Sequence, residues 1–116
     1  MIDLCLFQKR YDASTYNCAH FLRDSWLSVT GEDLSIVLSG FLSPKEDRAP
    51  DRKLLRRFER LENAVSPCVV MMRHGVARPH VGMFLEGRLL QIQENGVTWL
   101  PLQIATAGYP NVRFYK

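Results

Sequence analysis

The sequence predicts an α+β fold in which N-terminal helices pack on an antiparallel β meander. Apolar residues recur at helical spacing in the first half of the chain, and short alternating β segments follow Pro67. The 116 residues match the size of one packed domain, so we expect a single domain over residues 1–116. With 47% hydrophobic and 23% charged residues, the composition excludes a disordered or coiled-coil chain. No apolar run approaches the ~18 residues needed to cross a bilayer.

The first predicted helix runs from Cys18 to about Thr30. Its apolar residues recur at helical spacing: Phe21, Leu22, Trp26 and Val29. Asn17 precedes the helix and is a good N-cap, because its side-chain oxygen can accept a hydrogen bond from a free backbone N–H. Gly31 follows at the position where a left-handed residue commonly ends a helix. Caps and periodicity therefore define this helix at both ends.

The stretch between this helix and Pro67 is less regular. Residues 33–38 fit either a short helix or a strand. Residues 51–63 predict a second amphipathic helix, with five basic residues beside an apolar stripe of Leu54, Leu55, Phe58 and Leu61. Its basic face could bind phosphate, nucleic acid or anionic lipid. We favour a solvated surface on which the arginines pair partly with Glu59 and Glu62.

Five short β segments are expected after Pro67, at residues 69–72, 81–85, 89–92, 97–100 and 112–115. Glu86-Gly87 and Asn95-Gly96 are typical of hairpin turns. Strand alternation gives the 80–85 segment two faces. One face carries Val81, Met83 and Leu85, and the other carries His80, Gly82 and Phe84.

Charge and cysteine content exclude several classes of protein. Fifteen Lys and Arg against 12 Asp and Glu give a net charge of +3, too mild to indicate nucleic acid by itself. The three cysteines, well separated in sequence, indicate neither a disulfide framework nor a zinc ribbon. The first ten residues carry an acidic residue where a signal peptide needs positive charge, so we expect cytoplasmic synthesis without a signal peptide.

Cys18 is the candidate nucleophile. It lies in the first turn of the predicted helix, where free backbone N–H groups and the helix dipole favour a thiolate and lower the thiol pKa. We expect this helix end to be polar and not necessarily buried. Cys5 and Cys68 lie among apolar residues and are interpreted as small buried side chains that do not react in the native state.

A nucleophilic cysteine needs a base, and His80 is the best placed of the three histidines. His20 projects away from Cys18 on the helix, and His74 follows a strand. If Glu86-Gly87 is a two-residue turn, Gly82 lies opposite Gln91 and His80 opposite Gln93, so either amide could orient the imidazole. A zinc site made from the three histidines and Cys18 is an alternative, but its spacing fits no compact ligand pattern.

Two segments resemble the NlpC-type superfamily of cell-wall cysteine peptidases: residues 16–26 (YNCAHFLRDSW) and residues 80–91 (HVGMFLEGRLLQ). The resemblance implies a papain-like α+β fold without metal or organic cofactor. Carried over by position, Cys18 would be the nucleophile, His80 the general base and acid, and Gln91 the residue that orients His80. Gln93 stays a candidate from hairpin geometry. The backbone N–H of Cys18 would contribute to an oxyanion hole.

The sequence departs from the family beside the cysteine. The family usually reads Asp-Cys-Ser, and its Asp and Ser help bind the free amine of the peptidoglycan stem peptide. Here Asn17 and Ala19 occupy these substrate-binding positions. These two differences weaken the expectation that the protein makes the family's usual cut after γ-D-glutamate. Cleavage of a different bond in the wall, or a protein that keeps the fold without catalytic activity, is also consistent with them.

The sequence around Cys18 and at residues 111–115 is most similar to the peptidase domain of tailed-phage tail-tip and tail-assembly proteins. That resemblance implies a virion component with other tail-tip proteins as partners, acting on peptidoglycan at the host wall, with no nucleic-acid ligand. A secreted antibacterial effector of the same fold is a neighbouring interpretation. The alternative function is structural and not enzymatic: a tail-tip subunit that plugs the tail hub.

Overall fold

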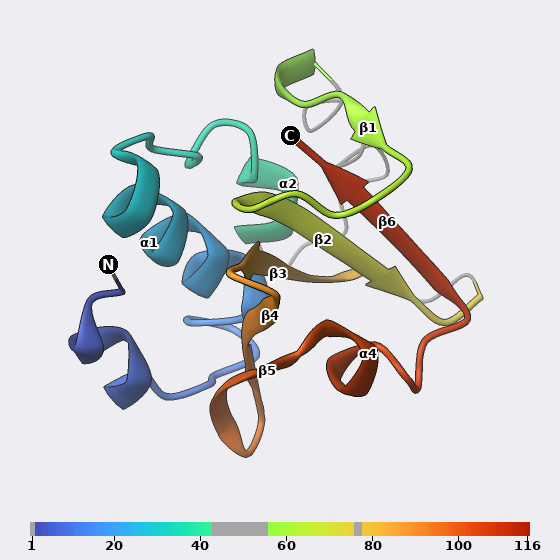
Figure 1. Ribbon diagram of the computed structural model, residues 1–116. Coiled ribbons are helices and arrows are strands. Elements are labelled where there is room, and N and C mark those ends of the chain that lie inside the picture. The colour runs from blue at the N-terminus through green and yellow to red at the C-terminus, as the bar shows by residue number, and fades with distance from the viewer. Residues whose placement is uncertain (1, 43–55, 76–77) are drawn as a thin grey trace.

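The computed structural model describes residues 2–42, 56–75 and 78–116, which form one antiparallel sheet with helices packed against both of its faces (Figure 1). The helices are η1 (Leu4–Gln8, a 3-10 helix), α1 (Cys18–Thr30), α2 (Ser39–Leu42) and α4 (Leu102–Ala105). The strands are β1 (Arg60–Leu61), β2 (Cys68–Arg73), β3 (His80–Leu85), β4 (Arg88–Gln93), β5 (Gly96–Pro101) and β6 (Asn111–Tyr115). The predicted α+β class is confirmed. No helix in the described ranges has the length and apolar character to cross a membrane.

The sheet is a meander only in part. Strands β2 to β5 follow one another as neighbours, as predicted, but β6 does not lie beside β5. It returns across the sheet and pairs antiparallel with both β2 and the short β1, giving the order β1-β6-β2-β3-β4-β5 (Figure 1). The five predicted β segments are confirmed, each extended by one residue or two.

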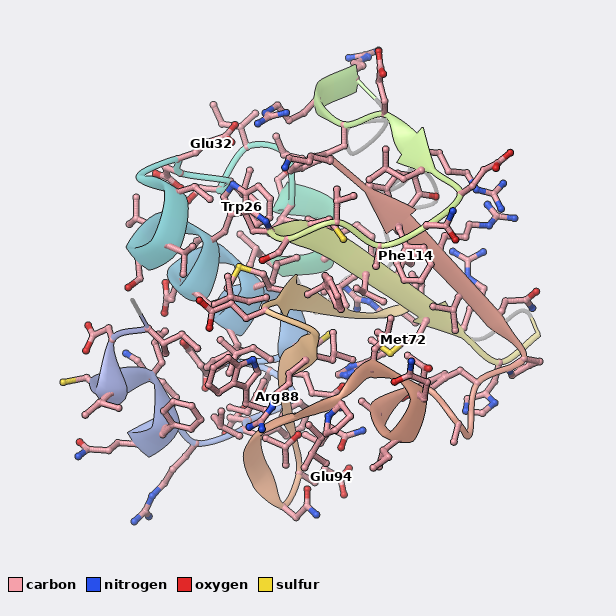
Figure 2. All side chains as sticks on the ribbon, viewed as in Figure 1. Trp26, Glu32, Met72, Arg88, Glu94 and Phe114 are labelled. Atoms are coloured by element: carbon pink, nitrogen blue, oxygen red, sulfur yellow. The ribbon has the colours of Figure 1, made fainter. Side chains whose placement is uncertain are left out.

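The sheet buries apolar side chains on both faces. One face packs against α1: Val81, Met83, Leu90 and Ile92 of the sheet join Phe21, Leu22 and Trp26 of the helix in one cluster. The opposite face carries a second cluster that includes Met72 and Phe114, on the neighbouring strands β2 and β6 (Figure 2). A buried Leu or Phe contributes about 1.5–3 kcal/mol relative to an exposed one, so the larger α1 cluster fixes the helix on the sheet.

Helix α1 begins and ends where its caps predict. The Asn17 Oδ1 accepts hydrogen bonds from the N–H groups of Ala19 (2.9 Å) and His20 (3.3 Å). At the other end Gly31 adopts a left-handed φ of 79° and donates its N–H to the Leu27 carbonyl at 2.9 Å. Local sequence therefore determines where the helix starts, and with it the position of Cys18 in its first turn.

The segment at residues 33–38 forms neither of the predicted elements. Its backbone makes a single turn in which the Leu38 N–H donates to the Leu34 carbonyl at 2.8 Å, and regular helix begins only at Ser39. The Asp33 carboxylate accepts a hydrogen bond from the Ser35 N–H, which favours a turn over a helix here. Leu34 and Leu38 are nevertheless fully buried in the α1 cluster.

The helix predicted over residues 51–63 is wrong from Phe58 onward. Residues 51–55 lie outside the described ranges, and only residues 56–57 are helical. Glu59 exchanges two backbone hydrogen bonds with Lys116, at 3.0 and 2.9 Å, so the chain enters the sheet as β1. Pairing with β6 satisfies the backbone and overrides the helical periodicity. Arg57 pairs with Glu32 at 2.6 Å, and not with Glu59 or Glu62.

The two predicted hairpins are present, one of them shifted. Glu86 and Gly87 have φ values of 51° and 80° and connect β3 to β4 as a two-residue turn. In the second hairpin Gln93 pairs with Gly96, so the turn residues are Glu94-Asn95 and not Asn95-Gly96. This shift makes Glu94 the first residue of the β4–β5 turn.

Candidate active site

Cys18 lines a pocket of about 340 Å³ together with His80. Helix α1 brings the thiol there from one side, and the first residue of β3 brings the imidazole from the other. The backbone N–H of Val81, the residue after His80, is close enough to the Cys18 sulfur to lower its pKa. The nucleophile and base predicted from the sequence therefore share one pocket at the junction of α1 and β3.

His80 is held by Gln91. The His80 Nε2 and Gln91 Oε1 lie 2.6 Å apart, and Gln91 is only 2% exposed. Strands β3 and β4 have the predicted register, with Leu85 opposite Arg88. Hairpin geometry alone favoured Gln93 as the partner, but the hydrogen bond runs diagonally to Gln91, the residue chosen from the resemblance. Gln93 instead lines a neighbouring pocket.

Gly82 explains why the diagonal contact forms. A Cβ atom built on Gly82 would lie 3.3 Å from the Gln91 Cβ and 3.0 Å from the Leu90 carbonyl oxygen, closer than ordinary contacts. Without that Cβ, the Gln91 side chain can lie along the surface of β3 and reach the imidazole two residues earlier in the strand. The small residue and the amide thus act together to orient His80.

The hydrogen bond to Gln91 also sets the imidazole tautomer. An amide oxygen only accepts hydrogen bonds, so the His80 Nε2 carries the proton and Nδ1 keeps its lone pair as the basic atom. Burial lowers the pKa of His80 below its ordinary value, and the contact with Gln91 opposes part of that change. His80 is therefore neutral at pH 7 and available as a base.

The thiol of Cys18 does not have the lowered pKa that its helix position predicted. Burial raises the Cys18 pKa, and the Val81 N–H and the Arg78 charge offset only part of the rise. Among the hydrogen bonds of the described residues, none joins this thiol to the imidazole of His80. The pocket therefore holds a neutral thiol and a neutral imidazole at pH 7.

The other two cysteines differ from each other. Cys68 is completely buried, as predicted, and burial raises its pKa. Cys5 was also interpreted as a buried side chain, and this is wrong, because it is exposed on η1. The short 3-10 helix buries only Leu6, so its neighbours face outward.

Tyr109 lies against His80 and was not predicted. Its ring is stacked on the imidazole, with centroids 6.1 Å apart and planes 10° from parallel, and its centroid lies 4.5 Å from that of His74. Tyr109 therefore belongs to the aromatic surroundings of His80. Tyr109 comes from the irregular segment between α4 and β6, where no periodic pattern marks it. The return of the chain to pair β6 with β2 brings it to His80.

Tyr11 and Arg78 also line the Cys18 pocket. Burial raises the pKa of Tyr11, and so do the Cys18 thiolate that forms at high pH and the nearby Glu94 carboxylate, so the Tyr11 hydroxyl stays protonated and can donate a hydrogen bond. Arg78 Nη2 donates to the carbonyls of Gly40 (3.1 Å) and Phe41 (2.9 Å). Tyr11 lies shortly before residues 16–26, and Arg78 lies shortly before residues 80–91. Only this position in the sequence could have indicated that they line the pocket.

The residues flanking Cys18 serve the fold. Asn17 reaches the pocket, but its Nδ2 donates to the Phe41 carbonyl at 3.0 Å and its Oδ1 caps the helix. Ala19 is completely buried in the α1 cluster. His20 turns its Nδ1 back to the Asn17 N–H at 3.1 Å. This helix end is therefore more buried than the polar sequence predicted.

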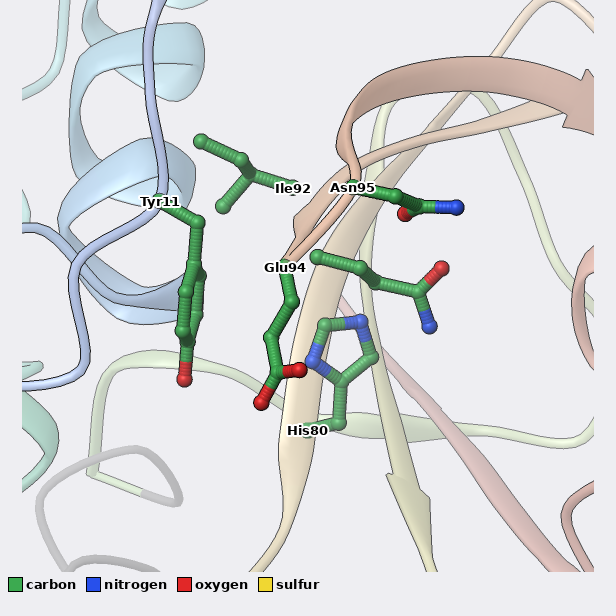
Figure 3. A pocket seen from close by; sticks show the side chains of 6 residues that line it. Tyr11, His80, Ile92, Glu94 and Asn95 are labelled. Carbon is green, nitrogen blue, oxygen red and sulfur yellow. The ribbon is translucent and has the colours of Figure 1, made fainter.

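A second, more open pocket of about 460 Å³ also lies at His80 (Figure 3). Tyr11 and His80 line both pockets, and Ile92, Gln93, Glu94 and Asn95 complete the second. In the described part of the chain, no three His, Cys, Asp or Glu side chains gather closely enough to hold a metal ion.

Comparison with known proteins identifies no family for the chain. No family model matches the chain, no curated protein matches it, and no solved structure matches it.

Proposed function

We propose that the chain is a papain-like, NlpC-type cysteine peptidase or amidase that cleaves a peptide amide bond of peptidoglycan. One observation carries the proposal: a single pocket contains the Cys18 thiol and a His80 imidazole whose Nε2 is bound by Gln91 at 2.6 Å. A thiol, a base and a group that orients the base are the parts that nucleophilic acyl transfer needs.

The neutral resting pair determines the proposed sequence of proton transfers. As the Cys18 sulfur attacks the amide carbonyl, the His80 Nδ1 takes the thiol proton. The imidazolium then returns that proton to the amide nitrogen, the C–N bond breaks, and the amine leaves. Water attacks the remaining thioester with His80 as base, releasing the carboxylate and restoring the thiol. The Cys18 N–H stabilises the carbonyl oxygen during attack, and the protonated Tyr11 hydroxyl lies in the same pocket.

Placement in a phage tail is the second part of the proposal. It rests on the similarity of residues 16–26 and 111–115 to tail-tip peptidase domains. In this role the chain would be carried in the virion among other tail-tip proteins and would meet peptidoglycan during entry. A secreted effector would share the chemistry but not these partners, and purified tail particles probed for the chain by mass spectrometry distinguish the two.

Digestion of purified peptidoglycan tests the activity. Wild type should release fragments with new peptide ends, identified by mass, and neither Cys18→Ala nor His80→Ala should release them. Cys5→Ala is the matched control, because it removes a thiol from the exposed η1 and should retain full activity. If the folded wild type cleaves no wall of several chemotypes, the enzymatic proposal is overturned.

A structural tail-tip subunit without turnover is the second candidate. It is favoured by the raised Cys18 pKa and by Asn17, whose polar atoms are occupied by Phe41 and the helix cap. This candidate predicts that Cys18→Ala and His80→Ala particles assemble and infect as wild type does. A loss of infection with normal assembly would support the enzyme instead.

A further inference from the structure

We propose that the Glu94 carboxylate binds a positively charged amino group on the leaving half of the substrate. The inference rests on the proposed function, since it assigns the two pockets to the two halves of a cleaved amide. It names the chemistry that would select one wall peptide over another.

The arrangement of the pockets distinguishes the two halves. Cys18 lines only the smaller pocket, whereas His80 and Tyr11 line both. The acyl group becomes bonded to the Cys18 sulfur, so it occupies the pocket that contains Cys18. The leaving nitrogen must reach His80 to receive its proton, and the chain beyond that nitrogen continues past the imidazole. The larger pocket, with His80 but without Cys18, is where that leaving segment would lie.

The larger pocket is negatively charged. Of the residues that line it, Glu94 alone carries a full charge when His80 is neutral. In Figure 3 the Glu94 carboxylate extends from the β4–β5 turn to a position between the rings of Tyr11 and His80. Glu94 belongs to neither of the ion pairs formed among the described residues, Arg23–Asp24 and Arg57–Glu32. Its charge also helps to raise the pKa of Tyr11, which places it within electrostatic reach of the site.

Among the described residues that line the Cys18 pocket, none carries a carboxylate. Asn17 replaces the family's aspartate, and its amide is committed to Phe41 and to the helix cap. A cationic group on the substrate therefore finds its complement, Glu94, in the larger pocket. About 460 Å³ is many times the ~30 Å³ that one water occupies, enough for a side chain with a terminal amino group.

The test compares two synthetic stem peptides, L-Ala-γ-D-Glu-L-Lys-D-Ala and its form acetylated on the lysine ε-amine. Their acyl halves are identical, and the leaving halves differ in one charge. Glu94→Gln removes the proposed partner, and Glu86→Gln removes the same charge from the turn at the opposite end of β4. Cleavage is followed by kcat/KM, and the same peptides are titrated into Cys18→Ala protein to measure binding without turnover.

We expect wild type and Glu86→Gln to prefer the free amine about two- to fivefold, the range of an exposed ion pair, and Glu94→Gln to lose the preference. Added salt should reduce it. Equal cleavage of both peptides by wild type overturns this inference and leaves the peptidase proposal standing. If neither peptide is cleaved, that bond is not the substrate, and binding to Cys18→Ala decides: a preference that disappears with Glu94→Gln supports the inference, and equal or no binding overturns it.

Discussion

Gly82→Ala should disturb both the stability of the sheet and the His80–Gln91 contact. The added methyl group would lie 3.0 Å from the Leu90 carbonyl oxygen and 3.3 Å from the Gln91 Cβ. The carbonyl belongs to β4, which is paired with β3 on one side and β5 on the other, so it cannot move away easily. In a strand interior, Ala for Gly would otherwise stabilise by about 0.5–1 kcal/mol. We expect the overlap to exceed that gain.

The magnitude follows from the size of the overlap and of the protein. Overpacking by one methyl group in a tight site costs about 1–3 kcal/mol. With an unfolding entropy of about 2.1 cal/mol/K per residue and 116 residues, each kcal/mol lowers Tm by about 4 °C. After subtraction of the ~0.5–1 kcal/mol gain, Gly82→Ala should melt up to about 10 °C below wild type. Gly108→Ala is the matched control, because a Cβ atom there meets nothing within 4 Å.

Histidine NMR titration gives the readout at the site. The Gln91 contact raises the pKa of His80, so displacing Gln91 should lower that pKa further and broaden the ring N–H signal. The Tm, measured by calorimetry, and the His80 pKa, measured by NMR titration, are thus two independent measures of the effect of the added methyl group. If Gly82→Ala melts with wild type and His80 titrates unchanged, Gly82 is not what allows Gln91 to reach the imidazole.

Three further changes test the surrounding structure. Asn17→Ala removes the helix cap and a buried amide partner, and should cost about 1–2 kcal/mol in urea denaturation; a change below about 0.3 kcal/mol would show that the cap is dispensable. Burial lowers the pKa of His20 and His80 below their ordinary 6.5, so the unfolded chain takes up protons first as pH falls. The free energy of unfolding should accordingly fall below pH 6.5, and a flat profile from pH 7 to 5 would contradict this. Finally, Cys5 should react with a thiol reagent at once in the native protein, and Cys68 only on unfolding; equal native rates would refute their assigned burial.

The sequence predicted best where several local signals agree. Helix α1 has a capping side chain, a 3.6-residue apolar period and a terminal glycine, and all three point to the same bounds. The β3–β4 hairpin has a turn dipeptide and alternating strands, and its register follows from the turn. Residues 58–63 had only periodicity, and a partner 55 residues away in the chain outweighed it, since Arg60 pairs with Tyr115.

The site residues divide in the same way: local sequence patterns identify some of them, and contacts between separate parts of the chain place the others. Cys18 and His80 lie on elements that local patterns identify, so they could be named before the structure. Gln91 needed more than hairpin geometry, because its contact is diagonal and depends on the missing Cβ of Gly82. Tyr109 reaches His80 through the path of the chain between α4 and β6, which no short-range pattern encodes.

The position of β6 has a consequence for synthesis of the protein. Val70 of β2 pairs with Phe114 of β6, 44 residues later in the chain. At about 5–20 residues per second, a ribosome needs roughly 2–9 s to make that stretch, whereas a hairpin such as β3–β4 closes in about 1–10 μs. Throughout that interval β2, whose residues are buried on both faces in the finished sheet, has an open apolar edge. Variants that weaken β6 should therefore aggregate in the cell before they lose any chemistry at Cys18.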